Sequence, residues 1–297
     1  MKFSTNLIRT KKVCFSFLIG MLFCLNSCRC STNLEYDPRS ASQTFDDATK
    51  KTEQGDFQGA LRDYGIVLRS RSNANTYTNR AIVYTYLGNY DDAMADFDAA
   101  IKIDPNYFEI YLNRGTARAS LQRDFKGAIA DYDRAISINP TSSKAYNSRG
   151  AARRDSGDYV GAIKDLDQAI RIDPNNESAH FNRGNTYNDS GNASKAITDF
   201  NYLIKIKPSY LMAYIARSGS YEKLGDIQSA IADVDRVIQL NPKYIRAYYR
   251  RASIYASSGD RSQAISDYDR TISLAREQGD SETLQGASEA IKQLQSP

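Results

Sequence analysis

The amino-acid sequence predicts an all-α protein, an α-solenoid built from stacked helix–turn–helix hairpins. Three residue types recur with a period of 34 residues between residues 41 and 278. Alanine stands at position 20 of all seven repeat units, glycine at position 15 of six, and proline at position 32 of five. Glycine allows the positive φ that ends a first helix, and proline ends a second helix because it lacks the amide hydrogen. One hairpin cannot bury its apolar side alone, so we expect the hairpins to stack.

The N-terminal segment predicts an export signal. Four basic residues precede an apolar run of 13 residues at 13–25, which is too short to span a bilayer but has the length of a signal-peptide core. The run ends in Leu-Asn-Ser-Cys, and this tetrapeptide resembles the lipobox of bacterial lipoproteins. The resemblance implies a signal peptide over residues 1–27 and lipid attachment at Cys28, the first residue of the mature chain.

A lipid anchor predicts a place in the bacterial cell envelope. Several acyl chains hold a protein firmly at a membrane, whereas one chain gives only marginal binding. Arg29 follows the cysteine, where an aspartate would favour the inner membrane, so we expect the outer membrane. Residues 28–40 then form the lipidated N-terminus and a polar tether. The alternative is an ordinary secretory signal and a secreted protein.

Seven units follow the tether, and each predicts two helices separated by a turn. The apolar residues at positions 20, 21, 24, 27 and 28 form one stripe on the second helix. Position 8 is always small, which lets the two helices approach closely, and position 24 is large and apolar. The units span residues 41–73, 74–107, 108–142, 143–176, 177–210, 211–244 and 245–278.

These recurring positions resemble the tetratricopeptide (TPR) repeat. The resemblance implies a right-handed superhelix of antiparallel helix pairs, in which the first helix of each pair lines a concave face. Residues 279–297 predict a C-terminal capping helix with one apolar face, as the exposed end of a solenoid requires. That face carries Leu284, Ala287, Ile291 and Leu294.

Two repeat positions carry opposite charges. Position 7 is arginine in six units and position 23 is aspartate in all seven. An arginine at an inward helical position needs a partner, because an unpaired buried charge is costly. We predict an Arg–Asp ladder in which each aspartate reaches forward to the next unit; the alternative is an arginine row that binds an acidic ligand. The predicted members are Arg80, Arg114, Arg149, Arg183, Arg217 and Arg251 with Asp63, Asp96, Asp131, Asp165, Asp199 and Asp233.

The concave face supplies candidate binding residues. Position 6 holds Asn79, Asn113 and Asn182, and an amide that both donates and accepts can hold a peptide backbone. This resembles the asparagine ladder of peptide-binding superhelices within the TPR family. The alternative is that these amides bond to neighbouring helices or to water. Further candidates in the groove are Asn147, Arg154, Phe181, Asn185, Arg246 and Tyr249.

Composition limits the chemistry. The formal charge is +4, but residues 1–27 hold four basic residues and no acid, so the mature chain has 35 of each sign and lacks the excess that nucleic-acid binding uses. All four cysteines fall within the first 30 residues, and His180 is the single histidine. No phosphate-binding loop or nucleophile elbow is present. We therefore expect no enzyme activity, cofactor, metal, nucleic acid or small-molecule substrate.

The sequence predicts a membrane-anchored scaffold or adaptor of the bacterial cell envelope. Its partners would be other proteins or peptides, bound on the concave surface. The lipid on Cys28 would attach the protein to the membrane. The alternative is a receptor or chaperone-like module that captures extended peptides in the groove.

Overall fold

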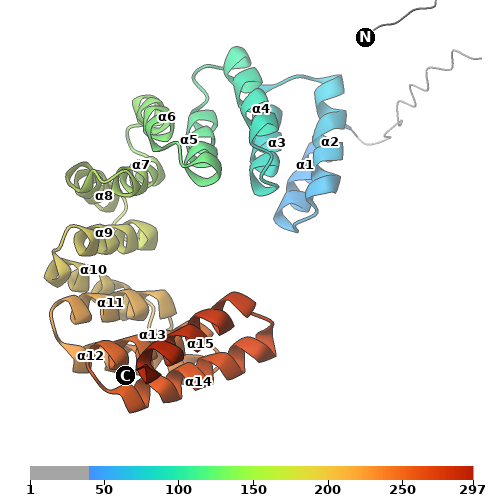
Figure 1. Cartoon of the computed structure of the whole chain (residues 1–297). Helices are drawn as coiled ribbons and strands as arrows, with labels where there is room; N and C mark the ends of the chain where they lie inside the picture. Colours follow the sequence, from blue (N-terminus) through green and yellow to red (C-terminus); the bar gives the residue numbers. More distant parts are fainter. Residues whose placement is uncertain (1–39, 297) are drawn as a thin grey trace, which may run out of the picture. The chain divides into compact units, whose positions relative to one another are not determined.

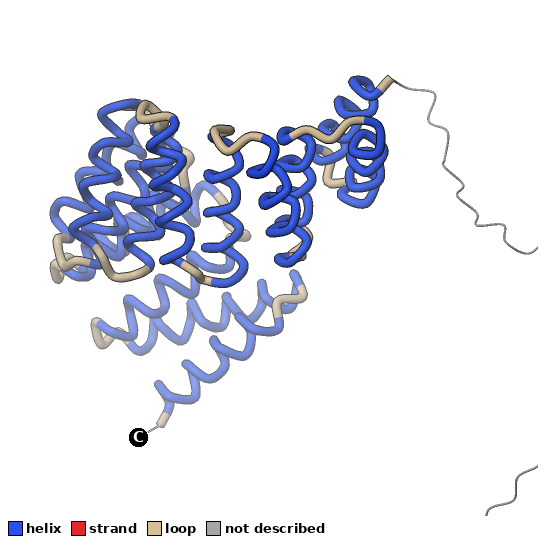
Figure 2. Tube along the Cα trace, turned by 90° about the horizontal axis from the view of Figure 1, so that it is seen from above, coloured by secondary structure: helices blue, strands red, loops and turns tan. Residues whose placement is uncertain are grey.

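The structure is a computed structural model that describes residues 40–296. Residues from Ala41 onward form one compact unit of structure. The predicted signal peptide, Cys28 and nearly all of the tether lie outside the described residues. Within the described part, the chain consists of helices and short loops, without a strand (Figure 2). No helix in this part is long and apolar enough to cross a membrane.

The helices form seven antiparallel pairs, which we call units 1 to 7 in chain order. The first helices of the pairs are α1 (Ala41–Glu53), α3 (Ala74–Tyr86), α5 (Phe108–Ala117), α7 (Ser143–Asp155), α9 (Glu177–Asp189), α11 (Leu211–Lys223) and α13 (Ile245–Ser257). The second helices are α2 (Phe57–Ser70), α4 (Tyr90–Ile103), α6 (Phe125–Ile138), α8 (Tyr159–Ile172), α10 (Ala193–Ile206), α12 (Ile227–Leu240) and α14 (Arg261–Gln278).

Each helix packs on its neighbours in the chain, so the pairs follow one another in a curved row (Figure 1). First helices of adjacent units also contact each other, as α3 and α5 do. Elements on the inside of a curve lie closest together, so the first helices line the concave side. The predicted all-α solenoid is confirmed. At its C-terminal end, α15 (Ser281–Gln295) packs on α14 with Ala287 fully buried.

Small and large residues interlock inside each pair. The alanines at position 20 are all fully buried. A Cβ atom added to Gly184, at position 8, would lie 2.7 Å from the ring of Phe200 at position 24. A Cβ atom added to Gly150 would likewise lie 2.8 Å from Leu166 Cγ. Close packing of this kind requires the small residue, because an added methyl group would force the neighbouring helix apart.

The turns follow the sequence pattern except in unit 3. The six glycines at position 15 have φ between +77° and +87°, a region that favours glycine. Unit 3 lacks this glycine and has one extra residue, which the chain accommodates in the π-helical turn η1 (Arg118–Gln122). Arg123 then takes the left-handed conformation at φ 54°, alone among the described non-glycine residues.

Candidate protein-binding groove and its charged framework

Arginine at position 7 binds aspartate at position 23 within one unit. Arg80 donates from Nε to Oδ2 of Asp96 and from Nη2 to Oδ1, both at 2.7 Å. This two-pronged geometry is the strong form of a carboxylate contact. It recurs in Arg114–Asp131, Arg149–Asp165, Arg183–Asp199, Arg217–Asp233 and Arg251–Asp267.

The forward register predicted for these pairs is wrong. That register joined Asp63 to Arg80, but Arg80 binds Asp96 of its own unit. In unit 1, where position 7 is an aspartate, Asp63 accepts instead from Lys51 Nζ at 2.8 Å. The physical reason is the packing of position 24 against position 8 of the same unit, which turns the adjacent position 23 toward the same first helix.

The forward contact exists, but position 25 makes it. Two residues along a helix turn the side chain by about 200°, toward the next unit. Arg114 Nη1 therefore meets Asp98 of unit 2 at 2.9 Å, in addition to its own Asp131. From the sequence, the recurring Asp-x-Asp pairs are either solvated or ladder positions, and the structure places the second aspartate of the pairs in units 2, 3, 4 and 6 in the contact between units. The other such contacts are Arg149–Asp133, Arg183–Asp167, Arg217–Asn201 and Arg251–Asp235.

The charged contacts are mostly shielded from solvent. The aspartates at position 23 are at most 7% exposed, while the arginine side chains are 15–22% exposed. Burial lowers the pKa of the Arg149 guanidinium, but hydrogen bonds to Asp165 and Asp133 outweigh burial and hold that pKa above its ordinary value. Both edges of the guanidinium are thus occupied by the protein itself. This geometry fits a framework joining the helices better than a site for an acidic ligand.

His180 belongs to the same framework. It stands at position 4, where Tyr111 of unit 3 donates its hydroxyl to the carbonyl of Pro105 at 3.0 Å. His180 places Nε2 3.2 Å from the carbonyl of Pro174 and Nδ1 2.8 Å from Asp199 Oδ1. Its contacts therefore tie a loop and a second helix to α9.

The asparagines at position 6 bond within the solenoid. Asn113 Nδ2 donates to the carbonyl of Glu109 at 2.7 Å, and Asn79 likewise bonds to Asn75 on its own helix. Asn182 Nδ2 instead crosses to the preceding unit and meets Asn147 Oδ1 at 2.9 Å. Only Asn182 thus bonds to a neighbouring helix, whereas Asn79 and Asn113 bond within their own helices. Their Oδ1 atoms receive no hydrogen bond from the described residues.

The other candidate groove residues differ in availability. Arg154 is paired with Asp155 at 2.8 Å. Phe181 packs on Phe200 and Tyr210, with ring centroids 5.9 Å apart in each case.

The structure places Arg246 and Tyr249 together. They line a cavity of about 380 Å³ beside the first turns of α15. Arg246 is exposed and Tyr249 half-buried, and the exposed Glu282 of α15 lines the same cavity, so its rim carries both a cation and an anion.

Helix α9 carries the densest set of amides. Asn182, Asn185 and Asn188 follow one another at intervals of three, so they lie on one face of the helix. Asn188 Oδ1 is the one buried side-chain oxygen or nitrogen in the described chain without a hydrogen-bond partner. A buried unsatisfied oxygen is unfavourable by about 1–3 kcal/mol. This amide can therefore turn toward a ligand N–H without losing an existing hydrogen bond of its oxygen.

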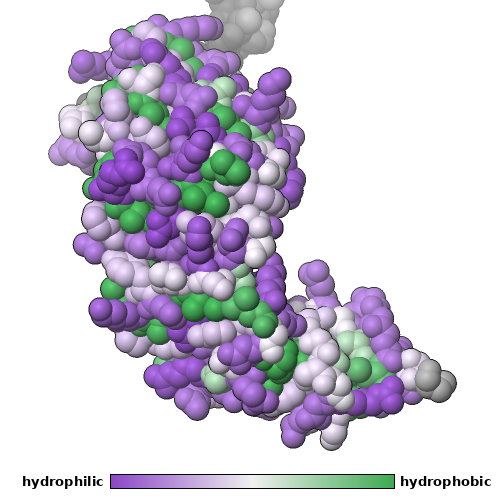
Figure 3. Space-filling view, turned by 90° about the vertical axis from the view of Figure 1, so that its left-hand side faces the viewer, coloured by the Kyte–Doolittle hydropathy of each residue, from purple (hydrophilic) through white to green (hydrophobic). Residues whose placement is uncertain are grey.

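The second helices present a different surface. Figure 3 views the side on which α8 and α10 lie in Figure 1, and its apolar side chains gather in separate patches on a hydrophilic face. Exposed apolar residues of the second helices include Ile103, Val160 and Ile206. Scattered apolar residues are normal on protein surfaces. We therefore place the candidate binding surface on the first helices.

Curated relatives match short parts of the chain. The small glutamine-rich tetratricopeptide repeat-containing protein 2 of Saccharomyces cerevisiae is 33% identical over 89 residues, covering 27% of this chain and 26% of that protein. The Hsp70-Hsp90 organizing protein of Triticum aestivum is 27% identical over 84 residues, covering 28% of this chain and 14% of that protein. The chain thus spans only about a seventh to a quarter of these relatives.

Solved structures match most of the chain at low identity. A tetratricopeptide repeat protein from Parabacteroides merdae has a TM-score of 0.67 and 20% identity, covering 86% of this chain and 99% of that one. The Cut9-Hcn1 hetero-tetramer of APC/C gives a TM-score of 0.65 and 17% identity, covering 89% of this chain and 51% of that one. At this identity, the likeness shows a shared fold.

Family models match five segments of the chain. The tetratricopeptide repeat models match residues 74–107, 177–210, 213–244 and 245–278, and a TPR repeat model matches residues 150–191. Together these segments cover more than half of the chain; four of them coincide with helix pairs, and residues 150–191 run from α7 to the end of α9. The chain therefore belongs to the tetratricopeptide repeat proteins, whose repeats are modules for protein–protein interaction.

Proposed function

We propose that this protein is a lipid-anchored scaffold of the bacterial cell envelope that binds other proteins through the first helices of its repeats. The lipobox-like tetrapeptide ending at Cys28 supports the anchor and the envelope, with the outer membrane favoured by Arg29. The helix pairs and their framework of ion pairs supply a rigid support. The anchor would keep the partners of the scaffold near one membrane surface.

The amide row on α9 carries this proposal. Asn182, Asn185 and Asn188 share one helix face on the concave side, and the buried Oδ1 of Asn188 lacks a partner. Side-chain amides supply both donors and acceptors, so they can match a main chain or polar side chains of a partner. The neighbouring Lys223 approaches the carbonyl of Asn188 at 2.6 Å and adds a cation to this part of the groove.

The anchor can be tested by metabolic labelling. Cells expressing the chain are fed radiolabelled palmitate, and the label should enter the wild-type protein but not Cys28→Ala. The variant should also leave the membrane fraction. Label that persists in Cys28→Ala refutes the anchor, and a secreted protein is then the alternative that remains.

The binding surface can be tested with an alanine variant of the amide row. Crosslinking in the native membrane identifies a partner, and its affinity is then measured for the wild-type chain and for Asn182→Ala/Asn185→Ala/Asn188→Ala. We expect affinity to fall about ten-fold or more, because several hydrogen bonds are lost together. Asn192→Ala, an exposed amide in the turn after α9, serves as the control and should bind normally. Equal affinities for all three proteins contradict the assignment to α9.

A second candidate function is a receptor or chaperone-like module for extended peptides. It is favoured by the chemistry of the amide row, since amides can hold a peptide backbone without regard to side-chain sequence. Unfolded or synthetic peptides of unrelated sequence would then bind the wild-type chain and lose affinity in the triple variant. Partners that bind only when folded favour the scaffold instead.

A further inference from the structure

A tyrosine fills one recurring slot between units. In units 2, 5 and 6 the last residue is a tyrosine that contacts position 2 or position 5 of its own first helix. Tyr107 donates its hydroxyl to Asn75 Oδ1 at 3.2 Å, and Tyr244 donates to Met212 Sδ at 3.5 Å. In unit 5, Tyr210 packs against Phe181, as described above. Burial raises the pKa of both Tyr107 and Tyr210, consistent with rings partly withdrawn from water.

Unit 1 has the slot without the tyrosine. This unit is one residue shorter, and its last residue is Asn73. Asn73 Oδ1 turns toward α3, where it accepts from Thr76 N at 2.8 Å and from Thr76 Oγ1 at 3.0 Å. Positions 2 and 5 of the unit, Ser42 and Phe45, are therefore left beside an open cavity of about 220 Å³.

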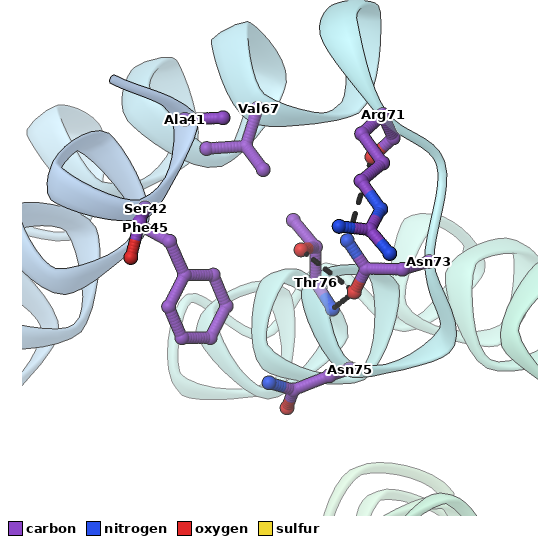
Figure 4. Close-up of a pocket in the computed structure, with 8 residues that line it drawn as sticks. All are labelled: Ala41, Ser42, Phe45, Val67, Arg71, Asn73, Asn75 and Thr76. Atoms are coloured by element: carbon purple, nitrogen blue, oxygen red, sulfur yellow. Dashed lines mark hydrogen bonds between the residues drawn. The ribbon is translucent and has the colours of Figure 1, made fainter. Parts of the chain in front are cut away.

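The cavity has an apolar interior and a polar rim. Figure 4 shows the ring of Phe45 and the methyl groups of Val67 pointing into the same space between α1, α2 and α3. Arg71 and Asn75 also line the cavity, across from Phe45 (Figure 4). Arg71 is exposed, and its guanidinium makes no ion pair or hydrogen bond among the described residues. Within the described residues, the rim therefore carries a positive charge without an ion-pair partner.

The same slot is open at the other end of the solenoid. Arg246 and Tyr249, which line the 380 Å³ cavity, are positions 2 and 5 of unit 7. The last residue of that unit is Gln278, whose side chain donates to the carbonyl of Lys243 at 2.9 Å. An absent tyrosine thus accompanies a cavity at both ends, from two independent sets of residues.

Two central units also lack the tyrosine, and in each of them position 5 is held by the protein itself. In unit 4, position 5 is Asn147, which bonds across to Asn182. In unit 3, position 5 is Leu112, which is 3% exposed. An accessible slot is therefore a feature of the ends, where a partner can approach.

We propose that the unit 1 cavity receives a tyrosine side chain of a partner protein that also carries an acidic residue close to that tyrosine. The slot has the size and shape for a tyrosine ring, because tyrosines of this chain occupy the equivalent slots of units 2, 5 and 6. The positive charge of Arg71 matches the acidic residue, and the aromatic contact with Phe45 matches the ring. The proposal rests on the proposed interaction role and names the chemistry of one contact.

The chain itself supplies a suitable probe. The loop Asp104–Tyr107 has the sequence Asp-Pro-Asn-Tyr and carries the tyrosine that occupies the unit 2 slot. This tetrapeptide, acetylated and amidated at its ends, is titrated into the full-length chain in detergent micelles and followed by NMR. We expect saturable binding that weakens about ten-fold or more when the tyrosine of the peptide is replaced by alanine. Equal binding of the two peptides, or no saturation at about 1 mM, overturns the proposal.

A substitution that fills the slot from within gives the matched test. Asn73→Tyr restores the residue of units 2, 5 and 6 and should weaken binding of the peptide about ten-fold or more. Asn73→Ser keeps the helix cap and the open slot, so it should bind as the wild type does. Equal affinity of Asn73→Tyr and wild type overturns the proposal, provided that both proteins have the same thermal unfolding midpoint.

Two further outcomes separate the neighbouring hypotheses. If wild type self-associates and Asn73→Tyr alone abolishes the association, the occupant is a second copy of this chain, and the partner assignment is overturned. If the α9 triple variant loses its partner while Asn73→Tyr leaves peptide affinity unchanged, the slot proposal fails and the proposed function stands. Loss of peptide binding in Asn73→Tyr, with normal binding of the α9 partner, supports the slot.

Discussion

Units 4 and 6 of the solenoid hold the same buried aspartate in two ways. In unit 4, Asp165 accepts from both Arg149 and Arg153. Arg149 also reaches Asp133 of the preceding unit at 2.5 Å. Every member of this cluster is charged, and its positive and negative groups alternate across the boundary between two units.

Unit 6 replaces two of these charges by neutral groups. Asp233 accepts from Arg217, but position 11 is Tyr221, whose ring centroid lies 5.7 Å from the guanidinium carbon of that arginine. The second contact of Arg217 is the amide of Asn201. The comparison distinguishes contacts that hold one hairpin together from contacts that surround them. The contact between positions 7 and 23 holds a hairpin together in both units, whereas the links around it vary.

The largest expected effect comes from removing the central carboxylate. Asp165→Ala leaves two arginines without their buried partner, and breaking such a contact costs about 3–5 kcal/mol. Asp233→Ala leaves only one arginine, which can rest on Tyr221, so we expect a smaller loss. Urea unfolding followed by far-UV circular dichroism measures both. Equal losses in the two variants would show that Arg153 contributes nothing.

A second prediction compares the stability lost by overpacking the interior of a hairpin with the stability lost by breaking its ion pairs. Gly184→Ala should destabilise the protein by about 1–3 kcal/mol, because the new methyl group meets the Phe200 ring. The control is Gly219→Ala, where the nearest atom to the new Cβ is Arg250 Nη2 at 3.4 Å. Alanine favours the helix over glycine, so the control should gain up to about 1 kcal/mol. Thermal unfolding of both variants checks the sign, and a gain in Gly184→Ala would refute the tight fit.

The repeat period was enough to predict the fold because each recurring residue determines one local feature, such as a turn or a close contact between helices. Glycine at position 15 takes the positive φ of the turn, and alanine at position 20 is buried against the neighbouring helix. Unit 3 broke the pattern, and there the sequence indicated an insertion but not its form. Whether an extra residue enters a loop or a π-helical turn depends on the packing of both flanking helices.

The register of the charged framework could not be predicted from the sequence alone. Aspartate occurs at both position 23 and position 25, and the two face different units because they differ by about 200° around the helix. Unit 1 held a usable signal, since Lys51 and Asp63 offer a pair within one unit whose position 7 is not arginine. The unit 1 cavity could not be predicted from the sequence either. Its signal, a unit without a final tyrosine, has meaning only once that tyrosine is seen filling a slot elsewhere.

The smallest expected effect tests whether the link between units is electrostatic. Asn201→Asp gives unit 5 the carboxylate that units 2, 3, 4 and 6 have at position 25. Arg217 Nη1 already donates to Asn201 Oδ1 at 2.5 Å, so it can donate to the new carboxylate in the same way. Position 201 is exposed, so the gain should be only about 0.2–1 kcal/mol. Salt screens exposed charges, so the gain in urea midpoint should appear at low ionic strength and vanish near 1 M salt. Asn201→Ser, which removes the amide without adding charge, is the control and should show no salt-dependent gain. A gain that survives high salt would mean that shape, and not charge, joins unit 5 to unit 6, because screening cannot weaken a packing contact.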